Sequence, residues 1–116
     1  TRAVELVREC VAAGFCKIHL DTGLACADDP GAHLPMETTA ERAAVLCRAA
    51  EAAADRQPAS RPRPLYGIGA EVPPPGGALE DPAQLKVATT GEVARTIAVT
   101  ERCFRSVGLE ASWERV

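Results

Sequence analysis

Hydrophobic and polar residues alternate along this chain with two periods, one helical and one strand-like. The first helical stripe lies within residues 4–13 and consists of Val4, Val7 and Val11, with Leu6 and Cys10 beside them. Gly14 follows the stripe and is predicted to stop the helix. Residues 16–21 then form a short apolar run that ends in a carboxylate, which is typical of a strand.

The same order of helix and strand repeats further along the chain. After a long acidic loop at residues 22–37, the run Thr38-Thr39-Ala40-Glu41 is interpreted as a capping box that opens a helix ending near residue 54. The predicted core face of this helix is formed by Ala43, Leu46, Cys47, Ala50 and Ala54. A loop of prolines and arginines at residues 56–64, interpreted as solvated, leads to a second predicted strand at residues 65–72.

Another long loop is predicted at residues 73–90, and a third helix follows it. Gly108 ends this helix, and its predicted core stripe is Val93, Ile97, Thr100, Phe104 and Val107. A further strand is expected to start near Val116. The resulting order αβαβα favours an α/β fold with parallel strands joined by right-handed crossovers.

The lengths of the loops favour a (β/α)₈ TIM barrel. Both loops that follow strands exceed the usual 2–6 residues, and in such barrels the loops after the strands carry the active site. A complete barrel needs about 250 residues, so residues 1–116 are interpreted as a partial barrel domain whose N- and C-terminal parts are missing. The alternative is a doubly wound open sheet, although the chain has no Gly-x-Gly-x-x-Gly turn for a dinucleotide.

Polar residues and glycines are predicted to share one face of the sheet. Side chains alternate along a strand, so the first strand places Lys17, His19 and Asp21 together, and the second places Gly67, Gly69 and Glu71 together. The apolar faces should meet the helices, and the polar faces should turn to the barrel interior. Because both strands end in an acid, Asp21 and Glu71 are candidates for one shared site, holding one ion or one hydrogen-bond network.

Each candidate residue also has a structural alternative. Asp21 could cap the following loop, Glu71 could pair with Lys17 or an arginine, and His19 could be an interior histidine whose hydrogen bonds are satisfied. Gly76 and Gly77 could form a simple reversal, or the hinge of a loop that closes over a phosphorylated substrate. Asp28-Asp29-Pro30 is typical of a turn, with carboxylates that are solvated or cap the loop.

Composition and charge narrow the class of protein. The net charge is −3 and no Lys/Arg cluster is interleaved with aromatic residues, which argues against a nucleic-acid partner. No apolar stretch approaches the roughly 20 residues of a membrane span. The five cysteines are odd in number and lack a Cys-x-x-Cys pair, which indicates a cytoplasmic protein rather than a disulfide framework. Cys26, in the acidic loop, is the one cysteine with a candidate chemical role.

Three runs in order carry a specific family resemblance: GFCKIHLDTGLACADDP, ETTAERAAVLCRAAE and YGIGAEVPPPGG. They resemble the Z subunit of class II tagatose-bisphosphate aldolase, closely from Gly14 to Gly77 and loosely beyond. The resemblance implies a TIM barrel in a chain several times longer. It also implies an accessory, non-catalytic subunit in galactitol and N-acetylgalactosamine catabolism, which the catalytic Y subunit needs for full activity and stability.

A more distant resemblance links the chain to the catalytic class II aldolases, which use Zn²⁺. It implies that Glu71 matches a zinc-binding residue, that Asp21-Thr22-Gly23 matches the end of a strand, and that Gly76 and Gly77 match a substrate loop. Ala78 and Leu79 stand where the acids of that loop are expected, which favours the accessory reading. The alternatives are a zinc-dependent aldolase acting on a sugar bisphosphate, and a class I lyase with Lys17 as Schiff base.

Overall fold

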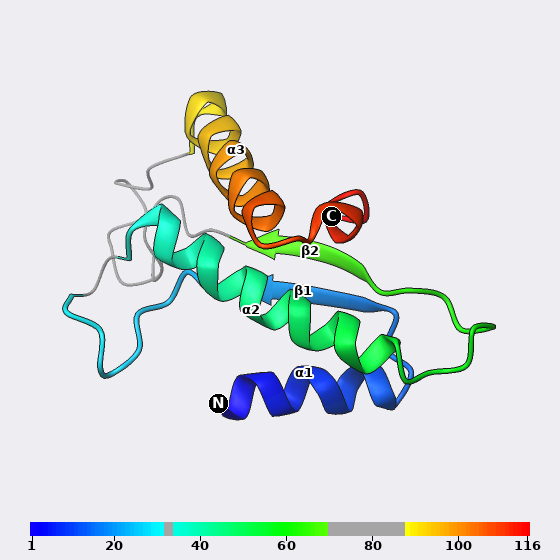
Figure 1. Cartoon of the computed structure of the whole chain (residues 1–116). Helices are drawn as coiled ribbons and strands as arrows, with labels where there is room; N and C mark the ends of the chain where they lie inside the picture. Colours follow the sequence, from blue (N-terminus) through cyan, green and yellow to red (C-terminus); the bar gives the residue numbers. More distant parts are fainter. Residues whose placement is uncertain (32–33, 70–87) are drawn as a thin grey trace.

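The computed structural model describes residues 1–31, 34–69 and 88–116, and this part of the chain is built from helices around two strands (Figure 1). In chain order the elements are α1 (Arg2–Ala12), β1 (Lys17–Asp21), α2 (Met36–Ala54), β2 (Leu65–Gly69), α3 (Thr90–Ser106) and α4 (Glu110–Trp113). The predicted order αβαβα is therefore confirmed, with one short helix added at its end.

The two strands are adjacent and parallel, as predicted. Residues pair in register from Lys17 opposite Leu65 to Asp21 opposite Gly69. Helix α2 crosses over one face of the sheet between the strands, and the connection has the right-handed sense (Figure 1). This is the expected sense, because a right-twisted strand feeding a right-handed helix packs back on the sheet only that way.

The helices cover one face of this sheet, and the core lies between them and the strands. Ile18, Leu20 and Tyr66 project from the strands into this layer and are buried. They meet the small residues of α2. The other helical segments add Val11 of α1, Phe104 of α3 and Leu109, which precedes α4. Helix α2 is buried over a wide arc because α1 and α3 both pack against it.

Glycine ends two of the helices in the same way. Gly14 and Gly108 have positive φ values of 101° and 76°, a backbone conformation that disfavours a Cβ atom. After α1, the Phe15 N–H donates to Cys10 O and the Gly14 N–H to Val11 O. After α3, Leu109 and Gly108 donate to Phe104 and Arg105 in the same pattern, which is the Schellman motif. Both predicted helix stops are confirmed.

Two predictions about the helices are wrong. Helix α2 begins at Met36, after Pro35, so Thr38 and Thr39 lie within its first turn and form no capping box. The Thr39 N–H already donates to Pro35 O at 3.1 Å, which makes it part of the helix. Along α3, Thr100 and Phe104 are buried, whereas Val93, Ile97 and Val107 are 40–48% exposed. The amino-terminal half of α3 extends away from the sheet, which leaves that part of the predicted stripe uncovered (Figure 1).

After α4 the chain returns to the second edge of β2. Successive N–H groups of a strand point to opposite edges. The Leu65 N–H donates to Cys16 O on the β1 side, and the Tyr66 N–H donates to Arg115 O at 2.8 Å. Arg115 therefore lies at the edge of β2 that faces away from β1.

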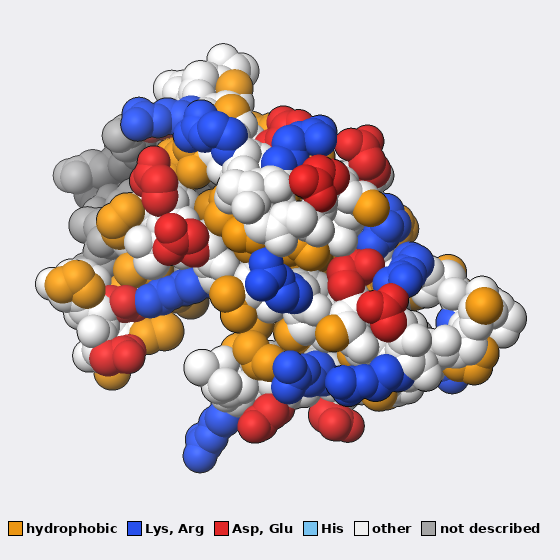
Figure 2. All heavy atoms as spheres, in the orientation of Figure 1, with side chains coloured by type: hydrophobic (Ala, Val, Ile, Leu, Met, Phe, Trp, Pro, Cys, Tyr) orange, Lys and Arg blue, Asp and Glu red, His pale blue; other side chains and the backbone are white. Residues whose placement is uncertain are grey.

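On the helical side of the molecule, acidic and basic side chains are intermingled and form no extended patch of one sign (Figure 2). Among the described residues, no helix is both long and apolar enough to cross a membrane.

Candidate functional site

The face of the sheet turned away from the helices carries the polar residues predicted for a site. Lys17, His19 and Asp21 alternate with the buried Ile18 and Leu20 along β1, and all three are exposed. This alternation confirms the predicted sharing of one face, since successive side chains of a strand point to opposite sides. The face is called the open face below, and β2 adds Leu65, Gly67 and Gly69 to it.

The two glycines of β2 make room for the His19 side chain. A Cβ atom built at Gly67 would lie 3.1 Å from His19 Cδ2, and one built at Gly69 would lie 3.2 Å from His19 Nε2. Contacts this short force a neighbour to move. The imidazole therefore lies across β2, over both glycines.

Asp21 lies at the carboxyl end of the open face, beside Gly69. Its Cγ atom is 3.5 Å from the position of a Cβ at Gly69, so the carboxylate and the imidazole both border Gly69. The structure thus brings Asp21 and His19 to one place. The predicted partner Glu71 and the loop glycines Gly76 and Gly77 lie outside the described residues.

The described part of the open face does not by itself fit a zinc ion. Catalytic zinc takes three protein ligands. In residues 1–31, 34–69 and 88–116, no group of three or more His, Cys, Asp or Glu side chains converges on one point. His19 and Asp21 could supply two donors at most.

The loop that follows β1 is tied to helix α2. Arg42 donates to both carboxylate oxygens of Asp29, at 3.0 and 2.5 Å, and the Cys26 N–H donates to Asp29 at 2.6 Å. Both interactions lower the pKa of Asp29, the Arg42 guanidinium most strongly. Asp29 thus caps the loop, one of the two alternatives predicted for it, and is also an ion-pair partner. The Arg42 guanidinium lies 3.9 Å from Cys26 Sγ.

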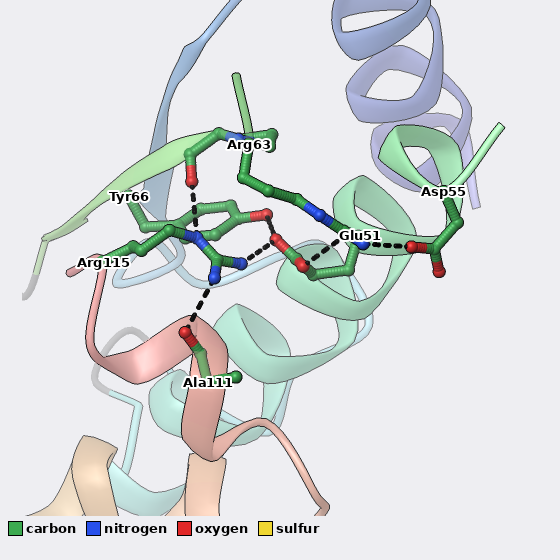
Figure 3. Close-up of polar contacts among 7 residues, drawn as sticks. Glu51, Asp55, Arg63, Tyr66, Ala111 and Arg115 are labelled. Atoms are coloured by element: carbon green, nitrogen blue, oxygen red, sulfur yellow. Dashed lines mark hydrogen bonds and ion pairs between the residues drawn. The ribbon is translucent and has the colours of Figure 1, made fainter. Parts of the chain in front are cut away.

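A second polar cluster, absent from the sequence predictions, centres on Glu51 of α2 (Figure 3). One carboxylate oxygen accepts from the Tyr66 hydroxyl at 2.5 Å and from Arg115 at 2.6 Å, and the other accepts from Arg63 at 3.0 Å. Arg63 also pairs with Asp55 at 2.5 Å. Arg63 is exposed, as predicted for this loop, and its guanidinium is also an ion-pair partner.

Arg115 connects this cluster to the backbone around it. Its guanidinium donates to Pro64 O at 3.1 Å and Ala111 O at 2.8 Å, besides Glu51 (Figure 3). The cluster joins α2, the beginning of β2 and the end of α4, on the helical side of the sheet. Its place near the amino end of β2 indicates a structural role, because sites in parallel sheets form at the carboxyl ends.

Cys47 lies buried beside the Glu51 cluster, and Tyr66, a member of the cluster, is also buried. Burial raises the pKa of the Cys47 thiol to about 11, so this cysteine is an unreactive apolar group near neutral pH. Burial, together with the hydrogen bond to Glu51, also raises the pKa of Tyr66. The five cysteines are all free, and Cys16 and Cys26 are the exposed ones.

Comparison with known proteins places the chain in a family. The family model described as D-tagatose-1,6-bisphosphate aldolase subunit GatZ/KbaZ-like matches residues 1–116. The chain belongs to the GatZ/KbaZ-like family. The chain corresponds to one segment of these proteins, because the curated relatives that it matches are about four times longer.

Two relatives illustrate the similarity. The D-tagatose-1,6-bisphosphate aldolase subunit GatZ of Salmonella typhimurium is 44% identical over 115 residues, which are 99% of this chain and 26% of the relative. The subunit of the same name from Klebsiella oxytoca is 45% identical over 118 residues, 99% of this chain and 27% of the relative.

A solved structure has the same fold over this GatZ/KbaZ-like segment. It is described as the crystal structure of a probable tagatose 6 phosphate kinase from Sinorhizobium meliloti 1021. The match has a TM-score of 0.71 and 32% sequence identity, and covers 95% of this chain and 23% of that chain. The α/β arrangement with two parallel strands is thus shared with a relative of known structure.

Proposed function

We propose that the full-length protein is an accessory subunit of class II D-tagatose-1,6-bisphosphate aldolase, which stabilises and activates a catalytic Y subunit. The observation that carries this proposal is the family match over all 116 residues, together with 44% identity to a GatZ subunit. The described segment is about a quarter of such a subunit, so the proposal concerns the whole protein. A role in galactitol and N-acetylgalactosamine catabolism, in the cytoplasm, follows from the same similarity.

The fold proposed for the full-length protein is a TIM barrel. Three features of the segment support it: parallel neighbouring strands, helices gathered on one face, and a chain that returns to the outer edge of β2 at Arg115. In a barrel the uncovered face becomes the interior, whereas a doubly wound sheet is covered by helices on both faces. The open face would then line the inside of the barrel.

An accessory role is favoured over independent catalysis by the sequence after Gly77. Ala78 and Leu79 stand there, and acids follow only at Glu80 and Asp81. Aldol cleavage needs a group that moves a proton, and loss of a general acid or base typically lowers the rate about 10²–10⁴-fold. The position of Asp21 beside His19 favours the second candidate, a zinc-dependent aldolase in which Glu71 and histidines from other strands complete the metal site.

An activity assay with the catalytic partner separates the two functions. The full-length protein alone should cleave tagatose 1,6-bisphosphate weakly or not at all, and should raise the activity or thermal stability of the catalytic Y subunit when the two are mixed. Robust zinc-dependent cleavage by the lone protein, abolished by Glu71→Ala, would contradict the accessory role and establish the enzyme. Glu101→Gln, on the outer surface of α3, serves as the matched control.

A further inference from the structure

A cleft opens at the amino ends of the two strands, at the opposite end of the sheet from Asp21. It lies between the turn after α1 and the loop that joins α2 to β2, and its volume is about 330 Å³. This volume is within the range of ligand-binding clefts in proteins. The cleft is called the amino-end cleft below, and its lining includes Val11, Phe15, Cys16, Pro58, Arg61 and Pro62.

Arg61 brings an unpaired positive charge to the wall of this cleft. Its Nη1 atom lies 2.9 Å from the position of a Cβ at Gly14, so the guanidinium rests against the turn at the carboxyl end of α1, where the helix dipole favours a cation. Within residues 1–31, 34–69 and 88–116, this guanidinium forms no hydrogen bond or ion pair. Arg63 of the same loop, by contrast, pairs with Glu51 and Asp55. The planar fork of an unpaired guanidinium suits a carboxylate.

Phe15 adds an exposed aromatic ring to the same cleft. The other three aromatic residues of the chain belong to the core or pack against it, whereas 62% of Phe15 is exposed. Aromatic residues and arginine are enriched in protein interfaces, where a few of them carry most of the binding energy. A small anion on Arg61 would leave Phe15 in water. A protein segment with an apolar side chain beside its carboxylate would cover both.

The loop that forms one wall of the cleft is long and stiff. It comprises ten residues, 55–64, where connections of 2–6 residues are usual in α/β units. Pro58, Pro62 and Pro64 restrict its backbone, and the Arg61 N–H donates to Pro58 O at 2.9 Å. The loop projects beyond the amino ends of the strands (Figure 1). A stiff, projecting loop loses little conformational freedom when a partner binds, which favours docking.

We propose that the amino-end cleft is a docking site for the catalytic Y subunit, which places an Asp or Glu carboxylate against Arg61 and an apolar side chain against Phe15. This inference rests on the proposed function, because it takes the Y subunit as the partner. Sites in parallel sheets form at the carboxyl ends of the strands. Contact at the amino ends therefore lets one subunit stabilise the other and leaves the carboxyl ends accessible.

Isothermal titration calorimetry of the full-length protein with the Y subunit tests the charged contact. Arg61→Gln should weaken binding about ten- to a hundred-fold, the range for loss of a hydrogen bond to a charged group. Arg56→Gln is the matched control, because it removes the same charge from the same loop at a position outside the lining of the cleft. This variant should bind as the original protein does.

The same measurement tests the apolar contact. Phe15→Ala should weaken binding about tenfold or more, as expected for an aromatic residue at the centre of an interface. Leu6→Ala is its control, because Leu6 is 64% exposed on α1 and does not line the cleft. Circular dichroism checks that each variant is folded.

Cysteine labelling locates the contact without any substitution. Cys16 and Cys26 are both exposed, and they lie before and after β1 respectively. Addition of the Y subunit should slow the reaction of Cys16 with N-ethylmaleimide, measured by peptide mass spectrometry, and leave that of Cys26 unchanged. A Cys16 that is already unreactive in the full-length protein alone would show that another segment of this chain fills the cleft, which would overturn the inference.

The inference would also be overturned by unchanged binding of folded Arg61→Gln, or by unchanged labelling of Cys16 in the complex. These outcomes differ from failure of the proposed function, which is measured as activation of the Y subunit. Binding through the cleft without activation would reject only the accessory role. Activation that does not depend on Arg61 would reject only the docking site, and absence of any complex would reject both.

Discussion

Glu51 connects segments that lie far apart in the chain. Its carboxylate receives hydrogen bonds from Tyr66 in β2, from Arg63 before that strand, and from Arg115, which is 64 positions away. Only 17% of the Glu51 side chain is exposed, so these contacts are shielded more than those of a surface ion pair. Removal of this charge would leave two guanidinium groups without their common partner.

Glu51→Gln should therefore lower the free energy of unfolding by about 1.5–3 kcal/mol, the usual contribution of a hydrogen bond to a charged group. The amide keeps the size of the side chain and its acceptor for Tyr66. Urea unfolding of the full-length protein gives the measurement, with Glu101→Gln as the control for an exposed ion pair. Equal stability of the two variants would show that the cluster contributes no more than a surface pair.

The residues of the open face could be predicted from the sequence because a strand has a period of two. Once residues 16–21 are taken as a strand, Lys17, His19 and Asp21 must share a face. The Glu51 cluster could not be predicted in this way. Its members come from α2, the loop before β2 and the segment after α4, and their meeting depends on how these elements pack.

At the scale of the elements, the ends of helices show how local sequence determines structure. Gly14 and Gly108 were predictable as stops because only glycine adopts the required backbone conformation without strain. The capping box was predicted at the wrong helix. Thr89 and Glu92 form one at the start of α3, with reciprocal hydrogen bonds, whereas Thr38 and Thr39 form none. The same Thr-x-x-Glu spacing at residues 89–92 could have identified it.

Thr89→Ala should lower the free energy of unfolding by about 1 kcal/mol, because it removes the side chain that caps the Glu92 N–H. Thr39→Ala is the matched control within the first turn of α2, where the hydroxyl makes only a long hydrogen bond of 3.4 Å to Pro35 O. Its effect should stay within about 0.5 kcal/mol. A loss from Thr39→Ala as large as that from Thr89→Ala would contradict the assignment of the two helix starts.

At the scale of the whole molecule, one further strand at the outer edge of β2 would account both for the exposed stripe of α3 and for the return of the chain to β2. Val93 and Ile97 are 48% and 45% exposed, although the pattern of apolar residues predicts a buried face. Periodicity identifies the face that is to be covered, and the covering element depends on the architecture of the full-length protein. A strand continuing from Arg115 along the outer edge of β2 would supply sheet beneath α3.

The barrel proposed for the full-length protein makes the open face its inside, and a crystal structure of the full-length protein tests this claim most directly. We expect a strand that begins near Arg115 and runs parallel to β2 on its outer edge. We also expect Lys17, His19 and Asp21 to lie within a closed ring of strands. A structure in which helices cover the open face, as in a doubly wound sheet, would contradict the account.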